Sequence, residues 1–126
     1  MTDLLAREPA DLGDRLLEFG AQIVRLVESL STTIVGRRIA DQLLRSATSV
    51  GANYEEARGA ESRADFVHKL QIALKEMREA HYWLRLIGRA QVLPERRVAP
   101  LIDEASQLRA ILAASVATAK GKRKQS

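Results

Sequence analysis

The sequence predicts an all-α protein, and three observations lead to that class. Helix-forming residues dominate the 126-residue chain, and aromatic residues make up only 4% of it. Stretches that alternate apolar and polar side chains, as a half-buried strand requires, are short, as at residues 69–72. Apolar residues recur instead at spacings of three and four, which places them on one face of a helix. We expect an up-and-down antiparallel four-helix bundle that occupies residues 1–119 as one domain.

The first helix is expected at about residues 11–30, because one apolar stripe runs through that segment. The stripe has a 3-4-3-4 spacing and consists of Leu12, Leu16, Phe19, Ile23, Leu26 and Leu30. A second helix is expected at residues 34–58, where apolar positions from Ile39 to Ala57 repeat at helical spacing. Gly59 is a plausible stop for it. Candidate N-caps for the second helix are Ser31, Thr32 and Thr33.

The third helix is expected at residues 63–88. Ser62 followed by Asp65 resembles a capping box, and the apolar stripe that starts at Phe66 continues to the region of Gly88. Only a few residues join this helix to the second one, so the two helices must be antiparallel.

The fourth helix is expected at residues 95–119, with Pro94 tolerated at its start. Pro100 leaves two alternatives open. Inside a helix a proline removes a hydrogen bond and costs about 3 kcal/mol, so either the helix is kinked there or it begins near Ala99.

The net charge of +4 comes from the C-terminus. Residues 1–119 contain 16 basic and 16 acidic side chains and are neutral as a whole. We expect residues 120–126 to form a basic, disordered tail. Its charged side chains are Lys120, Lys122, Arg123 and Lys124.

Arginines recur at the ends of three expected helices that an antiparallel bundle would bring together. They are Arg37, Arg38, Arg85, Arg89, Arg96 and Arg97. Such a cluster would make salt-sensitive contacts with nucleic-acid phosphates that do not depend on base sequence, and the basic tail would strengthen them. The alternative is ordinary solvated charge on a protein surface.

A polar stripe runs along the second and third expected helices, beside the apolar stripes. If the chain turns near residue 60 or 61, facing residues have numbers that sum to about 121, and Arg45 then faces Glu76. We call this set the polar ladder. It could set the register of the two helices, contribute to contacts between subunits, or bind a ligand or nucleic acid. Its members are Gln42, Arg45, Ser49, Asn53, Glu56, Asp65, Lys69, Glu76 and Glu79.

The sequence offers no set of residues for catalysis, and we expect a protein that is not an enzyme and needs no cofactor or metal. It has no cysteine, phosphate-binding loop or zinc-ligand spacing. His68 and His81 lie 13 residues apart, about 220° around a helix, so they cannot share a ligand. The N-terminus lacks the features of a signal peptide, and no stretch reaches the ~18 to 20 apolar residues that span a bilayer. A cytoplasmic protein without membrane contact is expected.

Residues 42–87 resemble the signature of the 23S rRNA intervening sequence proteins, a family of four-helix bundles. The resemblance is carried, in order and without gaps, by Gln42, Arg45, Ser46, Ser49, Ala52, Asn53, Glu56, Ala57, Asp65, Phe66, Lys69, Ala73, Lys75, Glu76, Glu79 and Trp83. It implies a left-handed up-and-down bundle that assembles as a ring-like homopentamer, and a link to reading frames inserted in ribosomal RNA genes. The family is also similar in fold to the accessory variability protein of diversity-generating retroelements, a pentameric barrel that binds nucleic acid and a reverse transcriptase.

A ring would also bury apolar residues that lie outside the core stripes, although a wide core stripe in a monomer is the alternative. These residues are Leu44, Ile72, Leu74, Trp83 and Leu86. The leading hypothesis is therefore a non-enzymatic homo-oligomer that binds RNA or DNA, or a protein that processes nucleic acid, through clustered basic residues. The alternative is a protein-protein scaffold that does not bind nucleic acid.

Overall fold

Four long helices account for most of the chain in the computed structural model, which describes residues 2–30 and 32–125, with side chains at 12–30 and 32–121. The elements are α1 (Thr2–Val27), the short 3-10 helix η1 (Glu28–Leu30), α2 (Ile34–Arg58), α3 (Arg63–Arg89) and α4 (Glu95–Gln125). The described residues contain no strand. The predicted all-α class is confirmed.

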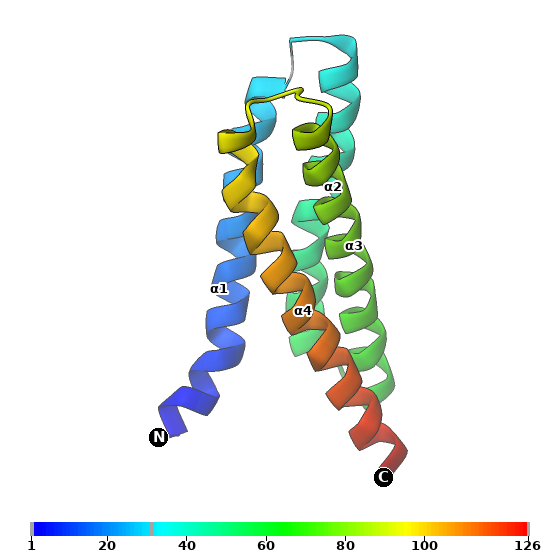
Figure 1. Cartoon of the computed structure of the whole chain (residues 1–126). Coiled ribbons are helices and arrows are strands. Elements are labelled where there is room, and N and C mark those ends of the chain that lie inside the picture. The colour runs from blue at the N-terminus through cyan, green and yellow to red at the C-terminus, as the bar shows by residue number, and fades with distance from the viewer. Residues whose placement is uncertain (1, 31, 126) are drawn as a thin grey trace.

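The helices alternate in direction, as Figure 1 shows. The α1–α2 and α3–α4 connections lie at one end of the bundle, which we call the head end and define as residues 28–41 and 85–97. The α2–α3 connection and both chain termini lie at the opposite end, which we call the tail end (Figure 1). This is the antiparallel up-and-down bundle that the sequence predicts.

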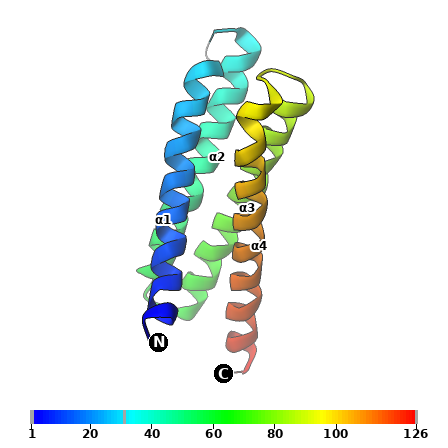
Figure 2. The ribbon, with the colours of Figure 1, turned by 60° about the vertical axis from the view of Figure 1, so that its left-hand side comes forward.

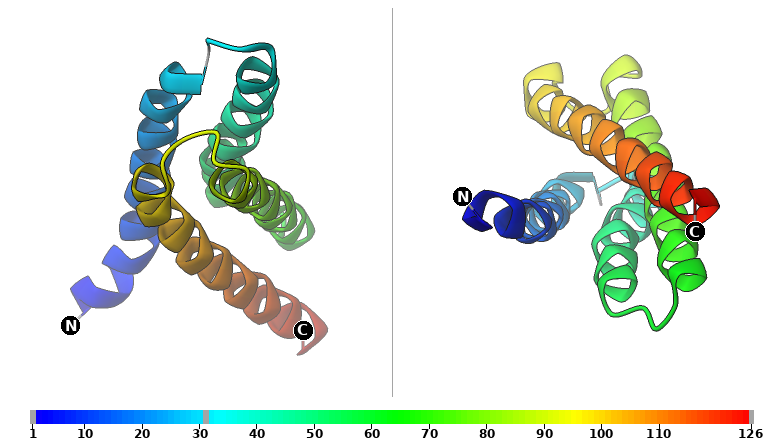
Figure 3. Two further views of the ribbon diagram at one scale, coloured as in Figure 1. Left: turned by 45° about the horizontal axis from the view of Figure 1, so that its top comes forward. Right: turned by 90° about the horizontal axis from the view of Figure 1, so that it is seen from below.

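The packing between helices is uneven. Helix α2 packs against α3, α3 against α4, and α1 against α2, and of these four neighbouring pairs the last, α1 and α4, has the fewest contacts. The two outer helices lie close near the head end and diverge toward the termini (Figures 2 and 3). The middle pair α2 and α3 is therefore the best-packed part of the molecule.

The core is built from the stripes that the sequence predicts. All six stripe residues of the first helix are buried, and Phe19 and Ile23 are 1% and 0% exposed. Fully burying one such side chain contributes about 1.5 to 3 kcal/mol. Leu74, expected at a subunit contact, is 8% exposed and belongs to the core of its own chain. A wider core stripe on α3 accounts for it.

Side-chain caps define where α2 and α3 begin. The Thr33 hydroxyl accepts a hydrogen bond of 2.9 Å from the backbone N–H of Gly36, and the Ser62 hydroxyl accepts one of 3.1 Å from Asp65. Thr33 is therefore the N-cap among the three candidates, of which Ser31 lies outside the described residues. Gly59 ends α2 as predicted.

Both outer helices extend beyond their apolar stripes. Helix α1 begins at Thr2 and not near residue 11, and α4 continues to Gln125 and not only to residue 119. The backbone of the segment expected to be a disordered tail is thus helical as far as Gln125, because lysine, arginine and glutamine favour helix and basic residues suit a helix C-terminus. Apolar periodicity marks the buried part of a helix and not its full length.

Pro100 lies within α4, so the alternative that the helix begins near Ala99 is wrong. Helix α3 runs one residue past the expected end at Gly88, and Ala90 caps it. No described helix combines the length and the apolar character needed to cross a membrane.

Candidate functional site

The centre of the polar ladder is a three-residue ion cluster between α2 and α3. The Arg45 guanidinium donates to Glu76 through Nη1, at 3.1 Å from Oε1, and to Glu79 through Nη2. The predicted pairing of Arg45 with Glu76 is present. The side chains of Arg45, Glu76 and Glu79 are 48%, 15% and 31% exposed, so the cluster lies at the rim of the bundle and not inside it.

The Glu79 carboxylate accepts hydrogen bonds from side chains on two helices, α2 and its own helix α3. It receives Arg45 from α2 and, at 3.0 Å, the indole N–H of Trp83 one turn along α3. The hydrogen bond from Arg45, followed by that from Trp83, lowers the pKa of Glu79 below its ordinary value. This carboxylate stays ionised at neutral pH and connects the ladder to a half-buried aromatic ring.

A sum of about 121 also places Asn53 near Lys69 and Glu56 near Asp65, an acidic pair that needs a basic neighbour such as Lys69. The structure shows which of these partners Lys69 takes. Lys69 bonds Glu56 at 2.6 Å and not Asn53, and the hydrogen bond to Glu56 raises the pKa of Lys69. The Asn53 amide donates to the carbonyl of Ser49 on its own helix, at 2.9 Å. Attraction between opposite charges decides this choice, because an amide cannot compete with a carboxylate for an ammonium group.

Ser46 lies beside the ladder but belongs to the core. Its side chain is 0% exposed, and its hydroxyl donates to the carbonyls of Gln42 and Leu43 at 2.9 and 3.2 Å. The hydrogen bonds within its own helix satisfy the hydroxyl, so Ser46 allows close approach of another helix without leaving a buried polar atom unpaired.

The head end gathers the six arginines of the predicted cluster, and all six are exposed. Arg97 on α4 donates to the hydroxyl of Ser29 at 3.0 Å and so connects the start of α4 to η1. The head-end segments also contain Glu28, Asp41 and Glu95, which leaves three arginines in excess of acidic residues there. Because residues 1–119 are neutral as a whole, the rest of that span has three acidic residues in excess, and the head end is its basic part.

The tail does not reinforce this cluster, which corrects the sequence-based expectation. Helix α4 runs away from the head end, and Lys120 lies 23 residues beyond Arg97. At 1.5 Å per residue the two are about 35 Å apart. The side chains of Lys122, Arg123 and Lys124 lie outside the described residues.

Two contacts between helices have no counterpart in the sequence-based prediction. Arg15 on α1 bonds Glu104 on α4 through two nitrogens, at 3.1 and 2.7 Å. On the seam between α3 and α4, Nη1 of Arg109 lies 3.3 Å from Nδ1 of His81. Neither pair could be found by spacing along one helix, since each depends on how a second helix is rotated against it.

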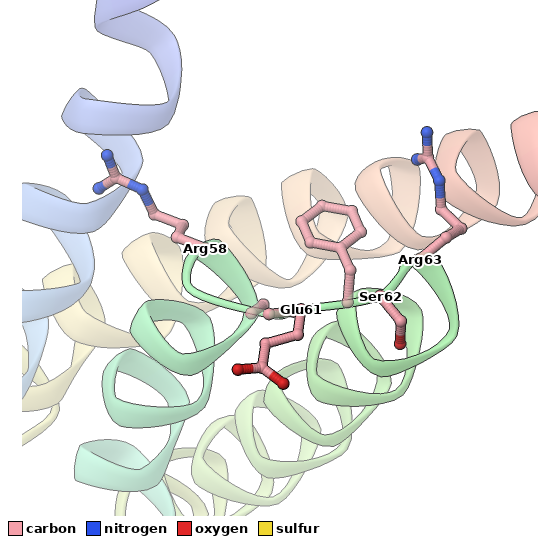
Figure 4. Close-up of a pocket in the computed structure, with 7 residues that line it drawn as sticks. Arg58, Glu61, Ser62 and Arg63 are labelled. Carbon is pink, nitrogen blue, oxygen red and sulfur yellow. The ribbon is translucent and has the colours of Figure 1, made fainter.

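The pocket at the α2–α3 connection does not suggest a cofactor site. Figure 4 shows Arg58 and Arg63 on opposite sides of the turn, with Glu61 and Ser62 between them. The Ser62 hydroxyl already caps α3. Among the residues whose side chains are described, no group of three or more His, Asp and Glu side chains could hold a metal ion.

The 23S rRNA-intervening sequence protein family matches residues 13–114, which include the ladder, the head end and the α3–α4 seam. The chain belongs to this family. Membership confirms the family resemblance of residues 42–87. No curated protein matches the chain.

A solved structure agrees with the family assignment. The chain is similar to a protein of unknown function from the S23 ribosomal protein family of Bacteroides thetaiotaomicron, with 35% sequence identity and a TM-score of 0.77. The alignment covers 86% of this chain and 96% of the other. Neither the 23S rRNA-intervening sequence protein family nor this neighbour is described as an enzyme.

Proposed function

We propose that this protein is a non-enzymatic, self-associating bundle that binds the phosphate backbone of RNA or DNA at its head end. The observation that carries the proposal is the convergence of six exposed arginines from three chain segments on one end of a neutral bundle. Arginine suits phosphate because its planar guanidinium donates two parallel hydrogen bonds. The name of the family, which refers to ribosomal RNA, favours RNA as the first ligand to test.

The test is fluorescence anisotropy with a labelled single-stranded RNA of 20 nucleotides, measured at several salt concentrations. We compare the wild type with the triple variant Arg38→Gln, Arg89→Gln and Arg96→Gln. Each phosphate contact contributes about 0.7 to the slope of log affinity against log salt for single strands, so this variant should lose about 2 units of slope. Binding should weaken for every RNA sequence alike.

The matched control removes three exposed cations elsewhere, with Arg58→Gln, Arg63→Gln and Lys75→Gln. Its net charge equals that of the head-end variant, but its affinity and salt slope should stay near the wild-type values. Equal losses in the two variants would show that only net charge matters and would overturn a head-end site.

Self-association is the second part of the proposal, and exposed apolar residues support it. Leu17 and Val24 on α1 are 73% and 45% exposed, and Ile34 and Val35 at the start of α2 are 71% and 61% exposed. Contact with further copies of the chain would cover such residues. A homopentamer is the assembly that the family resemblance implies. In a ring, the head ends of several subunits could face one nucleic acid.

A scaffold that binds only protein, such as a nucleic-acid-processing enzyme, is the competing function. It predicts a stable oligomer that ignores RNA at both low and physiological salt. The anisotropy experiment separates the two functions. A scaffold that does not bind RNA gives no increase in anisotropy with the wild type or with either variant.

A further inference from the structure

Charged side chains join the helices at three seams, α2–α3, α1–α4 and α3–α4, and the third differs from the other two. Between α2 and α3, Arg45 and Lys69 each have a carboxylate partner, and between α1 and α4, Arg15 has Glu104. Between α3 and α4 the corresponding contact joins Arg109 to His81, and neither group is an anion. Among the described side chains, no ion pair is found for Arg109 or for Arg85, one turn beyond His81 on α3.

The 3.3 Å contact specifies the protonation state of His81. A guanidinium can only donate, so the contact is favourable only when Nδ1 of His81 carries no proton. The ring proton then lies on Nε2, which remains a donor. Protonating Nδ1 would set a second positive charge directly against Arg109.

The charges around His81 all have one sign. Burial lowers the pKa of His81, and Arg109 on α4 and Arg85 on its own helix lower it further. No carboxylate contributes in the opposite direction. The seam therefore concentrates positive potential at a half-buried imidazole.

Small side chains flank Arg109 on its face of α4. On α4, Ser106 lies one turn before Arg109 and Ala113 one turn after it, so both share its face of the helix. Ser106 is exposed, and its hydroxyl is a further donor next to the seam. The seam thus offers guanidinium, imidazole and hydroxyl donors with no acceptor of matching charge.

We propose that His81, Arg85 and Arg109 form a phosphate-binding site on the α3–α4 seam, which shares only Arg85 with the arginines of the head end. A phosphate oxygen near Arg109 and His81 would accept from both groups, and once His81 is protonated it would offset the repulsion between the two cations. Protonated His81 then strengthens the site, so a phosphodiester, whose single charge does not change over this range, binds more tightly at pH 5.5 than at pH 7.5. The phosphate can be a free oxyanion or a phosphodiester of a nucleic acid.

The experiment is an NMR titration of the two histidines of the chain, His68 and His81, through their C2 protons. His68 lies 13 residues away and is exposed, so it serves as an internal reference, and the variant His68→Gln assigns the signals. The titration runs in chloride buffer and again with about 20 mM inorganic phosphate at equal ionic strength. We expect phosphate to raise the pKa of His81 by about 0.5 unit or more, and that of His68 by much less.

Two variants test the seam itself. In Arg109→Gln and in Arg85→Gln, the response of His81 to phosphate should be reduced or lost, whereas Arg63→Gln at the tail end should respond like the wild type. Arg85 is exposed, so its variant keeps the fold even if the loss of half-buried Arg109 disturbs packing. Circular dichroism checks that each variant is folded.

A second arm replaces inorganic phosphate with a single-stranded DNA of ten nucleotides. A response of His81 to phosphate alone identifies a site for a small oxyanion, and a response to the oligonucleotide at far lower concentration identifies a phosphodiester site. If neither ligand moves His81 more than His68, the site does not exist. The head-end triple variant should retain the response, so this inference and the proposed head-end function can fail separately.

Discussion

Gln91 shows how one residue ends a helix in an unfavourable conformation. Its φ of 58° lies in the left-handed region, which is unfavourable for residues other than glycine. The N–H groups of Gln91 and Val92 donate to the carbonyls of Gly88 and Ile87 at 3.2 and 3.0 Å. This is the hydrogen-bond pattern of the Schellman motif, in which glycine is the usual residue at the position of Gln91.

Replacing Gln91 with glycine should therefore stabilise the protein. The left-handed conformation costs an ordinary residue about 1 to 2 kcal/mol, and part of that is offset by the extra freedom of glycine in the unfolded chain, so we expect a gain of about 0.5 to 1 kcal/mol. Denaturation in urea measures it. The control is Ala90→Gly next to it, where φ of −84° is right-handed, and this change should destabilise.

Gly36 is required for a different reason, which is space. A Cβ atom there would lie 2.0 Å from the backbone oxygen of Leu30 and 2.9 Å from the Thr33 hydroxyl. Gly36→Ala should cost about 3 kcal/mol, because a backbone atom cannot move aside as a side chain can. At Gly20 a Cβ would have no neighbour within 4 Å, so Gly20→Ala should be neutral or raise the melting temperature. Thermal melts of Gly36→Ala and Gly20→Ala test these two predictions. Similar melting temperatures for the two variants would contradict them.

At the scale of elements, the α2–α3 pair depends on the ladder for its register. Arg45→Ala leaves Glu76 and Glu79 close together without their shared cation. Exposed ion pairs contribute up to about 1 kcal/mol, and we expect Arg45→Ala or Glu76→Ala to lose that much or to disturb assembly. Arg96→Ala should stay within about 0.5 kcal/mol of the wild type, since Arg96 is exposed at the head end.

Melting temperature and oligomer mass compare these three alanine variants. Arg45→Lys is a further control, because a lysine keeps the charge but cannot reach two carboxylates through separate nitrogens. Equal melting temperatures and equal masses for all three alanine variants would show that the ladder sets neither stability nor assembly.

For the whole molecule, the shifted pKa values predict a loss of stability on acidification. His81 has a lowered pKa in the folded protein, so the unfolded chain binds the proton first and stability falls as pH drops through about 6.5 and below. Glu79 also has a lowered pKa, and its contribution is lost as pH falls below about 4.5. Both effects act in the same direction.

The decisive range is pH 7.5 to 5.5, where carboxylates contribute little. We expect the melting temperature of the wild type to fall over this range in phosphate-free buffer, and that of His81→Gln to fall less. His68→Gln, which changes an exposed histidine on the same helix, should follow the wild type. If the fall in melting temperature with pH were reduced in His68→Gln and not in His81→Gln, the effect could not be attributed to His81.

The assembly of the whole molecule is open to a direct test by light scattering. The chain has a mass of 14.0 kDa, and a homopentamer should have five times that mass. The exposed apolar residues give the physical reason, because water contact at Leu17 and Ile34 is unfavourable. A measured mass of one chain at micromolar concentration would contradict the homopentamer, while the four-helix bundle of the single chain would still stand.

Local sequence determined the fold class, the two middle helices and much of the ladder. A helix and its apolar face follow from spacings of three and four, and a short connection forces two helices to be antiparallel. Those two facts place Arg45 against Glu76 without any knowledge of the rest of the chain. They also bring the six arginines to one end, since each lies near a helix terminus.

Only the tertiary structure decided the contacts between helices whose rotation the sequence leaves free. The pairing of Arg15 with Glu104 joins the first helix to the last, and that of Arg109 with His81 depends on how α4 is rotated against α3. Helical periodicity reports which face of a helix is buried, but which residues of two buried faces meet depends on packing throughout the bundle.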